Sequence, residues 1–578
     1  MVSWKLIQKA KALLEKERGT VRKSWGGRLT VCLLYPNLYH AGMSNLGFQT
    51  IYQRLNARDD VVCERAFLPE PEDLMEYQRT RTPLFSLESQ RPLTDFDLLA
   101  FSISFENDFL HVLTLLALAH LSPRRSERTE RDPLVMGGGV AVFLNPEPLA
   151  DFFDLFVLGE AEEVLEELLQ ILRASSSKQE VLKQASRIEG VYVPQFYHVS
   201  YGQEGKIEAV VPEEGLPKKI KRRWVATLDH FPTQSNLYTT ETELRGMALI
   251  EVNRGCPRGC RFCAASFVYF PFRNRSLSLL RSVAGSVLSQ ESRIGLTGTA
   301  VSDYPDLVAL CENILSLQGN LAMASLRVDA ITPALLDCLK KGGIQSVALA
   351  PEAGTERLRR VLNKGYRDEE ILRAVGMLWE NGFSQIKNYF LIGLPSETDE
   401  EVRAILGLMN KARHQVALRR GAEKKSLKLI LSVNVFVPKP ATPFQWVPME
   451  RVSTLKRRLK ILRNGVRGDK GVELIHDLPK WAYLQALLSR GDRRVGQILM
   501  EAHRWQGDWD RALKGVSLNP DFFIYRRRDL DEIFPWDFID HGIPKEVLKE
   551  EYLKAMEEAG VTMSKEELSS SGERPEGV

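Results

Sequence analysis

The sequence predicts an α/β protein in which a doubly wound N-terminal domain is followed by a partial (βα)6 barrel and a helical C-terminal region. Short apolar runs of strand length alternate with helix-length segments in residues 28–175, and the same alternation returns in residues 246–446. Runs of this kind are typical of parallel strands that helices cover. A chain of 578 residues is also too long for one hydrophobic core, so we expect several domains.

Composition narrows the class of protein. Hydrophobic residues make up 44% of the chain and charged residues 26%, which is the profile of a globular protein. The net charge of +3 creates no overall field that would require nucleic acid or a membrane as a partner. The longest apolar run, near "HVLTLLALAHL", falls short of the roughly 20 residues that cross a bilayer. We therefore expect no membrane partner and a cytoplasmic location.

The N-terminal part contains a helix and a domain with parallel strands. Residues 1–27 predict a charged amphipathic helix without the apolar stretch of a signal peptide. The strands expected in residues 28–175 are "LTVCLLYP", "VVCERAF", "DLLAFSIS", "PLVMGGG" and "FDLFVLG". The run Gly137 to Gly139 follows one of them, where a bare backbone lets a ligand approach the carboxyl edge of the sheet. Residues 176–245 predict a β-rich linker with a hairpin and the basic segment "LPKKIKRRWV", an expected surface loop.

The second alternating region predicts the barrel. Its expected strands are "MALIEV", "RIGLTG", "AMASLRV", "QSVALAPE", "QIKNYFLIG" and "LILSVNVFV". Six βα units in series give a closed or three-quarter-open barrel, with all the loops that follow strands on one face. Residues 447–563 predict a helical, aromatic-rich domain, and residues 564–578 predict a disordered tail because they contain little apolar surface.

Three of the seven cysteines lie within eight positions, in "NRGCPRGCRFCAA". Cys256, Cys260 and Cys263 follow the first expected barrel strand with the spacing C-x3-C-x2-C. Structural zinc normally takes four ligands, a thioredoxin-type pair would leave Cys256 unexplained, and a disulfide is not expected in a reduced compartment. An iron–sulfur cube held by three thiolates uses all three residues and leaves one iron open for a small ligand.

The residues between these cysteines suit a tight loop around a charged group. Gly255 and Gly259 permit the chain to wrap closely. Arg254, Arg258 and Arg261 either offset the negative charge of thiolates and sulfides or serve solubility.

The motif "CPRGCRFC" has the spacing of the radical S-adenosylmethionine (radical SAM) superfamily, and the resemblance covers roughly residues 246 to 440. It implies a partial (βα)6 barrel, a [4Fe–4S] cluster on the three cysteines, and S-adenosylmethionine (SAM) bound at the open iron. Reductive cleavage of SAM would then give methionine and a 5′-deoxyadenosyl radical that abstracts a hydrogen atom from the substrate. Catalytic residues beyond the cofactors stay unknown at this stage.

Further segments resemble the SAM-binding parts of the family. Phe262 corresponds to the aromatic residue near the adenine, "LTGTAVSDYPD" to the segment that meets the amino group, and "YFLIGLPSETDEE" to the family's "GLPGET". "APEAGTERLRRVLNKG" is similar to a stretch of subfamilies with a cobalamin-type or methylthiotransferase-type N-terminal domain. The residues implied to contact SAM are Phe262, Thr297, Gly298, Thr299, Ser325, Arg327, Glu352, Gly393 and Pro395. For Glu352 and Arg327 an ion pair at the barrel rim is the alternative.

The first domain resembles the cobalamin-binding domain of one radical SAM class. The stretch that carries this resemblance is "VMGGGVAVFLNPEPLADFFDLFVLGEAEE". The residues implied to lie along the nucleotide tail are Ser102, Ser104, Gly137, Gly138 and Gly139. The D-x-H-x-x-G motif that ligates cobalt is broken, because Asn37 replaces the Asp and "AGM" follows His40. His40 is therefore expected to be an ordinary loop residue. Bound cobalamin and a retained fold without cobalamin stay open as alternatives.

The resemblance leaves the reaction open. With cobalamin it implies methyl transfer to carbon or phosphorus, and without cobalamin it implies hydrogen abstraction, sulfur insertion or rearrangement. The substrate is a small molecule, a peptide or RNA, and the reductant is of the flavodoxin or ferredoxin type. Rival hypotheses are an iron–sulfur electron carrier without SAM chemistry and a zinc-bearing barrel enzyme.

Two groups of residues are candidates for the substrate side of the site. One is the aromatic pair Phe444 and Trp446 in the proline-stiffened "VFVPKPATPFQWVPM", for which packing is the alternative role. The other is a charged and aromatic set in the C-terminal region, which together with basic residues 413–428 leaves room for an RNA substrate. This set is Arg490, Asp492, Arg493, Trp536, Asp537 and His541.

Overall fold

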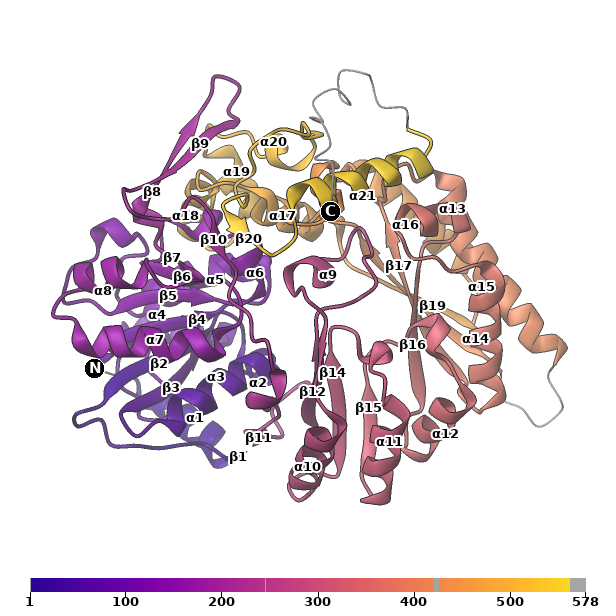
Figure 1. Cartoon of the computed structure of the whole chain (residues 1–578), viewed down its shortest axis with the longest axis horizontal. Helices are drawn as coiled ribbons and strands as arrows, with labels where there is room; N and C mark the ends of the chain where they lie inside the picture. Colours follow the sequence, from indigo (N-terminus) through magenta and orange to yellow (C-terminus); the bar gives the residue numbers. More distant parts are fainter. Residues whose placement is uncertain (1, 245, 420–425, 562–578) are drawn as a thin grey trace, which may run out of the picture. The chain divides into compact units, whose positions relative to one another are not determined.

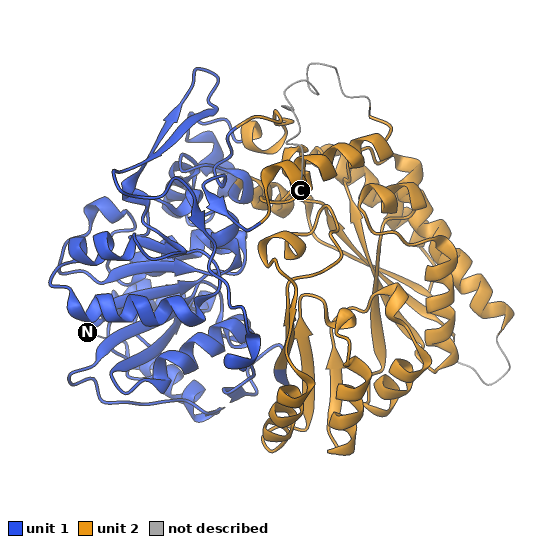
Figure 2. Cartoon of the chain, in the orientation of Figure 1, with its two compact units in different colours: residues 1–249, 488–520, 533–542 blue, residues 250–487, 521–532, 543–578 orange. Residues whose placement is uncertain are grey.

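The computed structural model describes residues 2–244, 246–419 and 426–561. The expected tail, residues 564–578, lies outside the described residues, and so does part of the basic segment 413–428. Figure 2 shows that the chain forms two compact units. Unit 1 contains residues 1–249, 488–520 and 533–542, and unit 2 contains residues 250–487, 521–532 and 543–578.

Unit 1 is built on a six-stranded sheet with the order β3-β2-β4-β5-β6-β7. The strands are β2 (Leu29–Tyr35), β3 (Val61–Phe67), β4 (Leu98–Ser102), β5 (Leu134–Gly138), β6 (Leu155–Val157) and β7 (Val191–Tyr192). All pairs are parallel except β6 with β7. The first five strands therefore have the doubly wound order 2-1-3-4-5, which confirms the predicted class. In this order the chain reverses direction across the sheet between β2 and β4, where such folds bind ligands.

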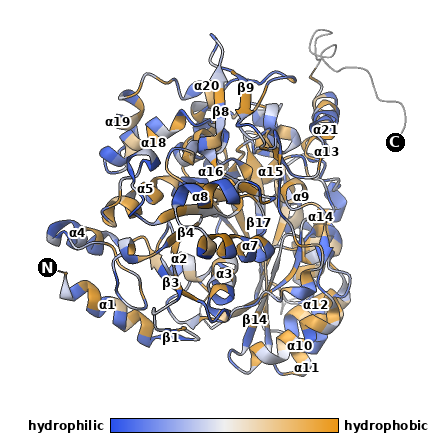
Figure 3. Cartoon of the chain, turned by 60° about the vertical axis from the view of Figure 1, so that its left-hand side comes forward, coloured by the Kyte–Doolittle hydropathy of each residue, from blue (hydrophilic) through white to orange (hydrophobic). Residues whose placement is uncertain are grey.

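Helices cover this sheet with their apolar sides. Helix α7 (Ala161–Ala174) buries Val164, Leu165, Leu168 and Leu169 and exposes charged residues, whereas α5 (Phe109–Leu118) is apolar nearly all round and largely buried. Figure 3 shows both hydrophobic and hydrophilic residues on α1 (Trp4–Glu15) and α7. The other helices of at least eight residues in the N-terminal part of unit 1 are α3 (Leu46–Ala57), α4 (Pro71–Thr80) and α8 (Lys178–Ala185). This spacing of apolar residues on α7 is the one expected of a helix with one face on a core.

Distant segments complete unit 1. The hairpin expected in residues 176–245 is present as β8 (Tyr197–Tyr201) and β9 (Ile207–Pro212). Helices α18 (Val495–Arg504) and α19 (Trp509–Lys514) also belong to unit 1. The buried amide of Asn145 donates to the carbonyl oxygens of Ser489 (3.0 Å) and Gly491 (2.7 Å), which fixes the C-terminal segment to the N-terminal domain.

Unit 2 contains the six strands predicted for the barrel, in two sheets with the orders β13-β12-β14-β15 and β16-β17-β18-β19. The strands are β12 (Ala248–Arg254), β13 (Arg273–Asn274), β14 (Arg293–Gly298), β15 (Asn320–Met323), β16 (Ser346–Glu352), β17 (Gln385–Ile392), β18 (Lys428–Val435) and β19 (Val472–His476). A bridge between Leu326 and Leu349 joins the two sheets, so the described strands form one open row.

Residues 447–561 are mostly helical, as expected, but they also contain the strand β19. It pairs in parallel with β18 over five residues, and its alternating burial is that of an edge strand. The remaining C-terminal helices are divided between the two units. Local sequence in this region favours helix, but pairing with a buried neighbouring strand satisfies the backbone of 472–476 instead.

Four helices of unit 2 begin at an N-cap residue whose side chain bonds to the helix backbone. Side-chain oxygens at four helix starts accept a hydrogen bond from the backbone N–H three residues on, as N-cap residues do. These caps are Ser276, Thr332, Thr355 and Thr398. The main helices are α10 (Leu277–Leu288), α11 (Leu307–Ser316), α12 (Pro333–Lys341), α13 (Glu356–Val361), α14 (Asp368–Glu380), α15 (Asp399–Leu418), α16 (Val452–Val466), α17 (Pro479–Arg490) and α21 (Lys545–Glu558).

The strands of unit 2 have one covered face and one open face. Along β17 the residues Ile386, Asn388, Phe390 and Ile392 are fully buried, and the alternate residues are only partly buried. Figure 1 shows α14 and α15 on one side of β16 and β17. Because side chains alternate along a strand, residues 387, 389 and 391 share the opposite, inner face. Among the described helices none has the length and apolar content that would let it pass through a membrane.

Candidate metal centre and its surroundings

The loop with the three cysteines follows β12 and is held closely against its surroundings. Gly255 has a φ of +78°, and a Cβ at this position would lie 2.6 Å from the carbonyl oxygen of Tyr269. The Gly259 carbonyl oxygen accepts a hydrogen bond from Asn363 Nδ2 at 3.0 Å. These contacts support the predicted role of both glycines in a tight loop.

All three cysteines have free thiols, and Cys260 is buried whereas Cys256 and Cys263 are half-buried. Burial raises the pKa of Cys263 to about 12, and it raises the pKa of Cys260 although the positive charge of Lys364 opposes that shift. Metal binding requires thiolates, so iron would have to displace these protons. Within the described residues no three His, Cys, Asp or Glu side chains gather at one point as ligands of a single ion. The donor set nevertheless fits a cube, because a cube takes its thiolates at separate irons.

The arginines of the motif have separate roles. Arg261 is buried, and its guanidinium donates to Glu551 (3.1 Å), Glu558 (2.9 Å) and the carbonyl oxygens of Arg360 and Val361. Arg261 therefore anchors the loop to α13 and α21 and serves neither of the two roles expected from the sequence.

The two remaining arginines pair with nearby carboxylates. Arg258 donates to Asp303 (2.7 Å), and Arg254 donates to Glu251 (2.9 Å), which also pairs with Arg275.

An ion pair lies beside the cysteine loop. Lys364 Nζ is 3.1 Å from Glu352 Oε1, and the two side chains are 9% and 13% exposed. Burial raises the pKa of Glu352, and Lys364 opposes that shift. Both residues are close enough to Cys260 for their charges to act on its thiol. Glu352 was predicted as a SAM contact, whereas Lys364 was missed because a single lysine after a helix carries no signal of its own.

The backbone of Glu352 is in a strained conformation. Its φ is +68°, in the left-handed region, and it follows a register shift between β16 and β17. Such a conformation costs a non-glycine residue about 1–3 kcal/mol and is found preferentially at functional sites.

The segment Thr297 to Thr299 is tied to the cysteine loop. The fully buried amide of Asn253 donates to the Ala300 carbonyl oxygen (2.7 Å) and accepts from the Ala300 N–H (3.1 Å). A Cβ on Gly298 would lie 2.5 Å from Asn253 Oδ1, so close approach explains this glycine. The Thr299 hydroxyl donates to the Gly255 carbonyl oxygen at 2.5 Å. Asn253, missed by the sequence analysis, thus positions the segment against β12.

The remaining residues predicted to contact SAM have different surroundings. Arg327 donates to both carboxylate oxygens of Asp329 (2.9 and 3.0 Å) and lies over the ring of Tyr366, so the alternative rim ion pair is present. Its charge nevertheless acts on Cys260. Ser325 is exposed, and its hydroxyl makes no hydrogen bond to any residue that the structure describes. Phe262 is half-buried within the cysteine loop.

The turn after β17 has a packing role. The Gly393 N–H donates to Glu397 (2.6 Å), and a Cβ on Gly393 would lie 2.8 Å from Leu455 of α16. The guanidinium of Arg458 donates to the same Glu397 carboxylate at 2.9 Å. Pro395 is half-buried in this turn. None of these contacts indicates that a nucleotide binds at this turn.

In unit 1 the residues at the switch point bond to one another. Asn37 Nδ2 donates to Asp108 (2.9 Å), and Asn45 Nδ2 donates to Ser104 Oγ (3.1 Å). His40 lies in the short helix α2 (Tyr39–Met43) and not in a loop, and its Nε2 is 3.6 Å from Glu243.

The glycine run is explained largely by packing. A Cβ on Gly137 would meet Phe156 at 2.7 Å, and one on Gly139 would meet the carbonyl oxygen of Ile103 at 2.4 Å. Only Gly138 has room for a side chain, with its nearest neighbour at 3.9 Å. It pairs with Ser102 at the ends of β4 and β5.

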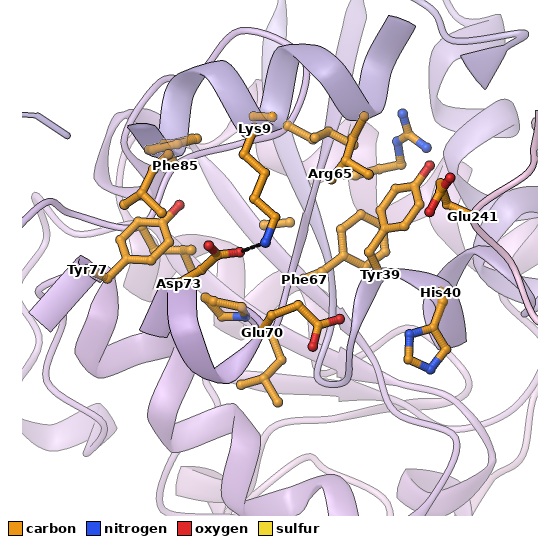
Figure 4. A pocket seen from close by; sticks show the side chains of 18 residues that line it. Lys9, Tyr39, His40, Arg65, Phe67, Glu70, Asp73, Tyr77, Phe85 and Glu241 are labelled. Atoms are coloured by element: carbon orange, nitrogen blue, oxygen red, sulfur yellow. Dashed lines mark hydrogen bonds and ion pairs between the residues drawn. The ribbon is translucent and has the colours of Figure 1, made fainter. Parts of the chain in front are cut away.

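A pocket of about 310 Å³ lies at the carboxyl ends of β2 and β3 in unit 1. Figure 4 shows the ion pair of Lys9 and Asp73 on one side and Tyr39 and His40 on the other. Its buried Arg65 is already neutralised by Glu17 (2.6 Å) and Glu88 (2.6 Å). No sequence motif marked this pocket.

The residues predicted for the substrate side are mostly structural. Phe444 and Trp446 are fully buried, and Trp446 packs on Tyr552 of α21 with ring centroids 5.5 Å apart, which is the alternative packing role. The C-terminal set lies in unit 1, where Arg493 donates to Glu147 (2.8 Å) and Arg494 to Asp492 (3.0 Å). The set is buried or half-buried: Arg490, Asp492, Arg493, Trp536, Asp537 and His541.

Family models match both parts of the chain. The model described as radical SAM superfamily matches residues 250–409, and the model described as radical SAM proteins, N-terminal, matches residues 47–194. The chain belongs to the radical SAM superfamily. Radical SAM enzymes use a [4Fe–4S] cluster and SAM, and the three cysteines lie within the matched region.

This radical SAM protein is also similar to several curated proteins. An uncharacterized protein of Methanocaldococcus jannaschii is 26% identical over 81% of this chain and 90% of its own. The ribosomal protein uS12 methylthiotransferase RimO of Thermosipho africanus is 22% identical over 45% of this chain and 63% of its own. An uncharacterized methyltransferase of Pyrococcus horikoshii is 24% identical over 51% of this chain and 61% of its own.

Solved structures of similar proteins include two radical SAM enzymes. TsrM of Kitasatospora setae, solved with tryptophan and a SAM analogue, has a TM-score of 0.47 and 16% identity and covers 72% of this chain and 75% of its own. The cobalamin-dependent enzyme OxsB, solved with aqua-cobalamin and SAM, has a TM-score of 0.46 and 13% identity and covers 94% and 83%.

Proposed function

We propose that Cys256, Cys260 and Cys263 hold the [4Fe–4S] cluster and that SAM binds at its open iron. The supporting observation is the loop geometry: three free thiols follow β12 on one anchored loop, with the Lys364–Glu352 pair next to Cys260. When bound and reduced, the cluster supplies the electron that cleaves SAM. A cube with three protein ligands retains an open corner, whereas an electron carrier normally has four cysteine ligands.

The chain's own residues would position these cofactors. Asn253 and Thr299 fix the segment after β14 to the cysteine loop, and Arg261 fixes the loop to α21. Lys364 and Glu352 carry opposite charges that act on Cys260, and they would suit the carboxylate and amino groups of SAM. The half-buried ring of Phe262 offers a surface for a base.

The test is anaerobic reconstitution with iron and sulfide, followed by EPR with and without SAM and by detection of 5′-deoxyadenosine. Replacing any of the three cysteines by Ala should abolish iron loading and SAM cleavage. Cys311→Ala is the matched control, because Cys311 is buried in α11 away from the loop. An EPR spectrum of the wild type that SAM does not change would overturn the proposal and favour an electron carrier.

We propose further that unit 1 binds cobalamin and that the reaction is a cobalamin-assisted methyl transfer to an acceptor that is still unknown. The strand order 2-1-3-4-5 and the polar side chains at the β2–β4 switch point support this. The fit is partial, because Gly137 and Gly139 are needed for packing and His40 contacts Glu243. Cobalt would therefore receive no ligand from His40.

Gly138 gives the sharpest test of cobalamin binding. It has room for a Cβ at the carboxyl edge, so the side chain of Gly138→Phe would start in open space and occupy the region in which a nucleotide tail would lie. We expect wild-type protein to retain cobalamin, measured by its absorption spectrum after anaerobic expression with cobalamin, and Gly138→Phe to lose it. Equal retention by both proteins, or none by the wild type, would contradict cobalamin binding at this edge.

A further inference from the structure

The inner face of β17 and β18 carries a group of polar side chains without partners. Lys387 and Tyr389 of β17 and Ser432 of β18 alternate with the fully buried residues of the same strands, and Tyr389 is directly paired with Ser432 in the register. Side chains at paired positions of parallel strands lie on the same face. The three side chains are therefore neighbours on the face that α14 and α15 do not cover.

Their polar atoms have no partner in the part of the chain that the structure describes. The ammonium of Lys387, the hydroxyl of Tyr389 and the hydroxyl of Ser432 make no hydrogen bond or ion pair to any described residue. Lys387 and Tyr389 are half-buried, and Ser432 is 6% exposed. None of the three polar atoms belongs to the fully buried ones without a partner, so solvent or a ligand can reach each of them from the inner face.

Lys387 also differs from several other charged residues on the strands of unit 2, which are paired. Glu352 pairs with Lys364, Glu251 with Arg254 and Arg275, and Lys428 with Glu473 at 2.7 Å. The Lys387 ammonium lies over the ring of Tyr389, 4.8 Å from its centroid, which orients it without neutralising its charge. The inner face therefore retains a positioned, uncompensated cation flanked by two hydroxyl donors.

We infer that Lys387, Tyr389 and Ser432 bind an oxyanion, a carboxylate or phosphate, on the substrate. Such a group accepts several charge-assisted hydrogen bonds at once, which matches one ammonium and two hydroxyls. Lys387 is the third residue of β17 and so lies near the start of that strand. Glu352 is the last residue of β16 and pairs with Phe390, three residues further along β17 than Lys387. The anion would be held below the cysteine loop, so the rest of a small acidic substrate extends toward the cofactors. This inference rests on the proposed function, because it names the substrate class of the same barrel.

Lysine acetylation followed by mass spectrometry tests the site without turnover. Full-length, cluster-loaded protein is treated with limiting acetic anhydride in the presence of inorganic phosphate, succinate or chloride at equal ionic strength. We expect phosphate or succinate to slow acetylation of Lys387 at least threefold and to leave Lys428 unchanged. Protection by phosphate alone assigns a phosphorylated substrate, and protection by succinate alone assigns a carboxylate.

Matched variants make the result specific. Tyr389→Phe and Ser432→Ala each remove one hydroxyl donor with little change in shape and should at least halve the protection of Lys387. Lys428→Met, on the neighbouring strand, should leave that protection as in the wild type. Equal protection of Lys387 and Lys428, no protection by either anion, or full protection in both hydroxyl variants would overturn the inference.

The proposed SAM chemistry and the proposed oxyanion site can be contradicted independently of each other. Iron content, EPR and SAM cleavage of the same wild-type preparation test the proposed function, whereas the protection of Lys387 requires neither electron transfer nor turnover. A preparation that cleaves SAM but shows no protection overturns only the oxyanion site. A preparation that shows protection but no cleavage overturns only the proposed chemistry.

Discussion

Lys364 Nζ lies 3.1 Å from Glu352 Oε1 in surroundings that leave the two side chains 9% and 13% exposed. The pair is near Cys260, and Glu352 adopts a left-handed backbone conformation to place its carboxylate there. The structure therefore puts opposite charges, in fixed positions, next to the thiol that would ligate the cluster.

The first prediction concerns the reduction potential of the cluster. Lys364→Gln removes a cation and should lower the midpoint potential by an amount on the order of tens of millivolts, because the added electron loses a favourable neighbour. Glu352→Gln removes an anion and should raise it. EPR-monitored redox titration of the reconstituted proteins measures both shifts. Lys428→Gln is the control, since Lys428 pairs with Glu473 at the start of β18. Shifts of the same sign in the two variants would contradict this placement of charges.

The second prediction concerns the close approach of Gly298 and Asn253. Gly298→Ala would place a Cβ 2.5 Å from Asn253 Oδ1, so either the segment after β14 or the end of β12 must move. We expect a loss of about 1–3 kcal/mol in the free energy of unfolding, measured by urea denaturation, and reduced iron loading. Gly285→Ala in α10, where no atom lies within 4 Å of the added Cβ, should instead stabilise by roughly 0.5–1 kcal/mol. If Gly298→Ala changes neither the free energy of unfolding nor the iron loading, the contact between Gly298 and Asn253 does not fix the loop.

The third prediction concerns the anchor of the cysteine loop. Arg261→Met removes one hydrogen bond from each of four acceptors, the carbonyl oxygens of Arg360 and Val361 and the carboxylates of Glu551 and Glu558. Arg360 keeps the Asn363 N–H and Glu551 keeps Lys554 as donors. We expect a loss of about 2 kcal/mol in the free energy of unfolding, because four hydrogen bonds of a buried guanidinium are lost together. Arg403→Met, which breaks an exposed pair with Glu400, should change it by no more than about 0.5 kcal/mol. Equal effects of the two substitutions would mean that Arg261 is not an anchor.

The fourth prediction concerns pH and His541 in unit 1. Burial, with help from the positive charge of Arg222, lowers the pKa of His541 from its ordinary value of 6.5 to about 3, and neither ring nitrogen has a partner among the described residues. As the pH falls below 6.5 the unfolded chain takes up a proton that the folded chain refuses until about pH 3. The imidazole therefore costs stability in that window, about 2 kcal/mol between pH 6.5 and pH 5.

Variants isolate this contribution. His541→Leu should remove that part of the pH dependence in urea denaturation at pH 7, 6 and 5. His414→Leu, at an exposed position of α15, should retain it. Identical pH profiles for wild type and His541→Leu would show that the imidazole is not held neutral.

Much of the fold follows from local sequence. The strands of the barrel were predicted because short apolar runs alternate with helix-length segments, a pattern that is set within a few residues. The family resemblance followed from the spacing of Cys256, Cys260 and Cys263, which is likewise local. The strand β19 was missed because its backbone is satisfied by β18, some forty residues earlier in the chain.

The sequence by itself determined the α/β class, the superfamily and the loop with the three cysteines. Only the tertiary structure decided which charges meet: Lys364 with Glu352, Arg327 with Asp329, and Arg261 with α21. It also decided that Lys387 meets no carboxylate of a described residue, whereas Lys428 on the next strand pairs with Glu473. The physical reason is that charge pairing depends on distances of a few ångströms between segments far apart in the chain, which strand register and helix packing set and residue type alone does not.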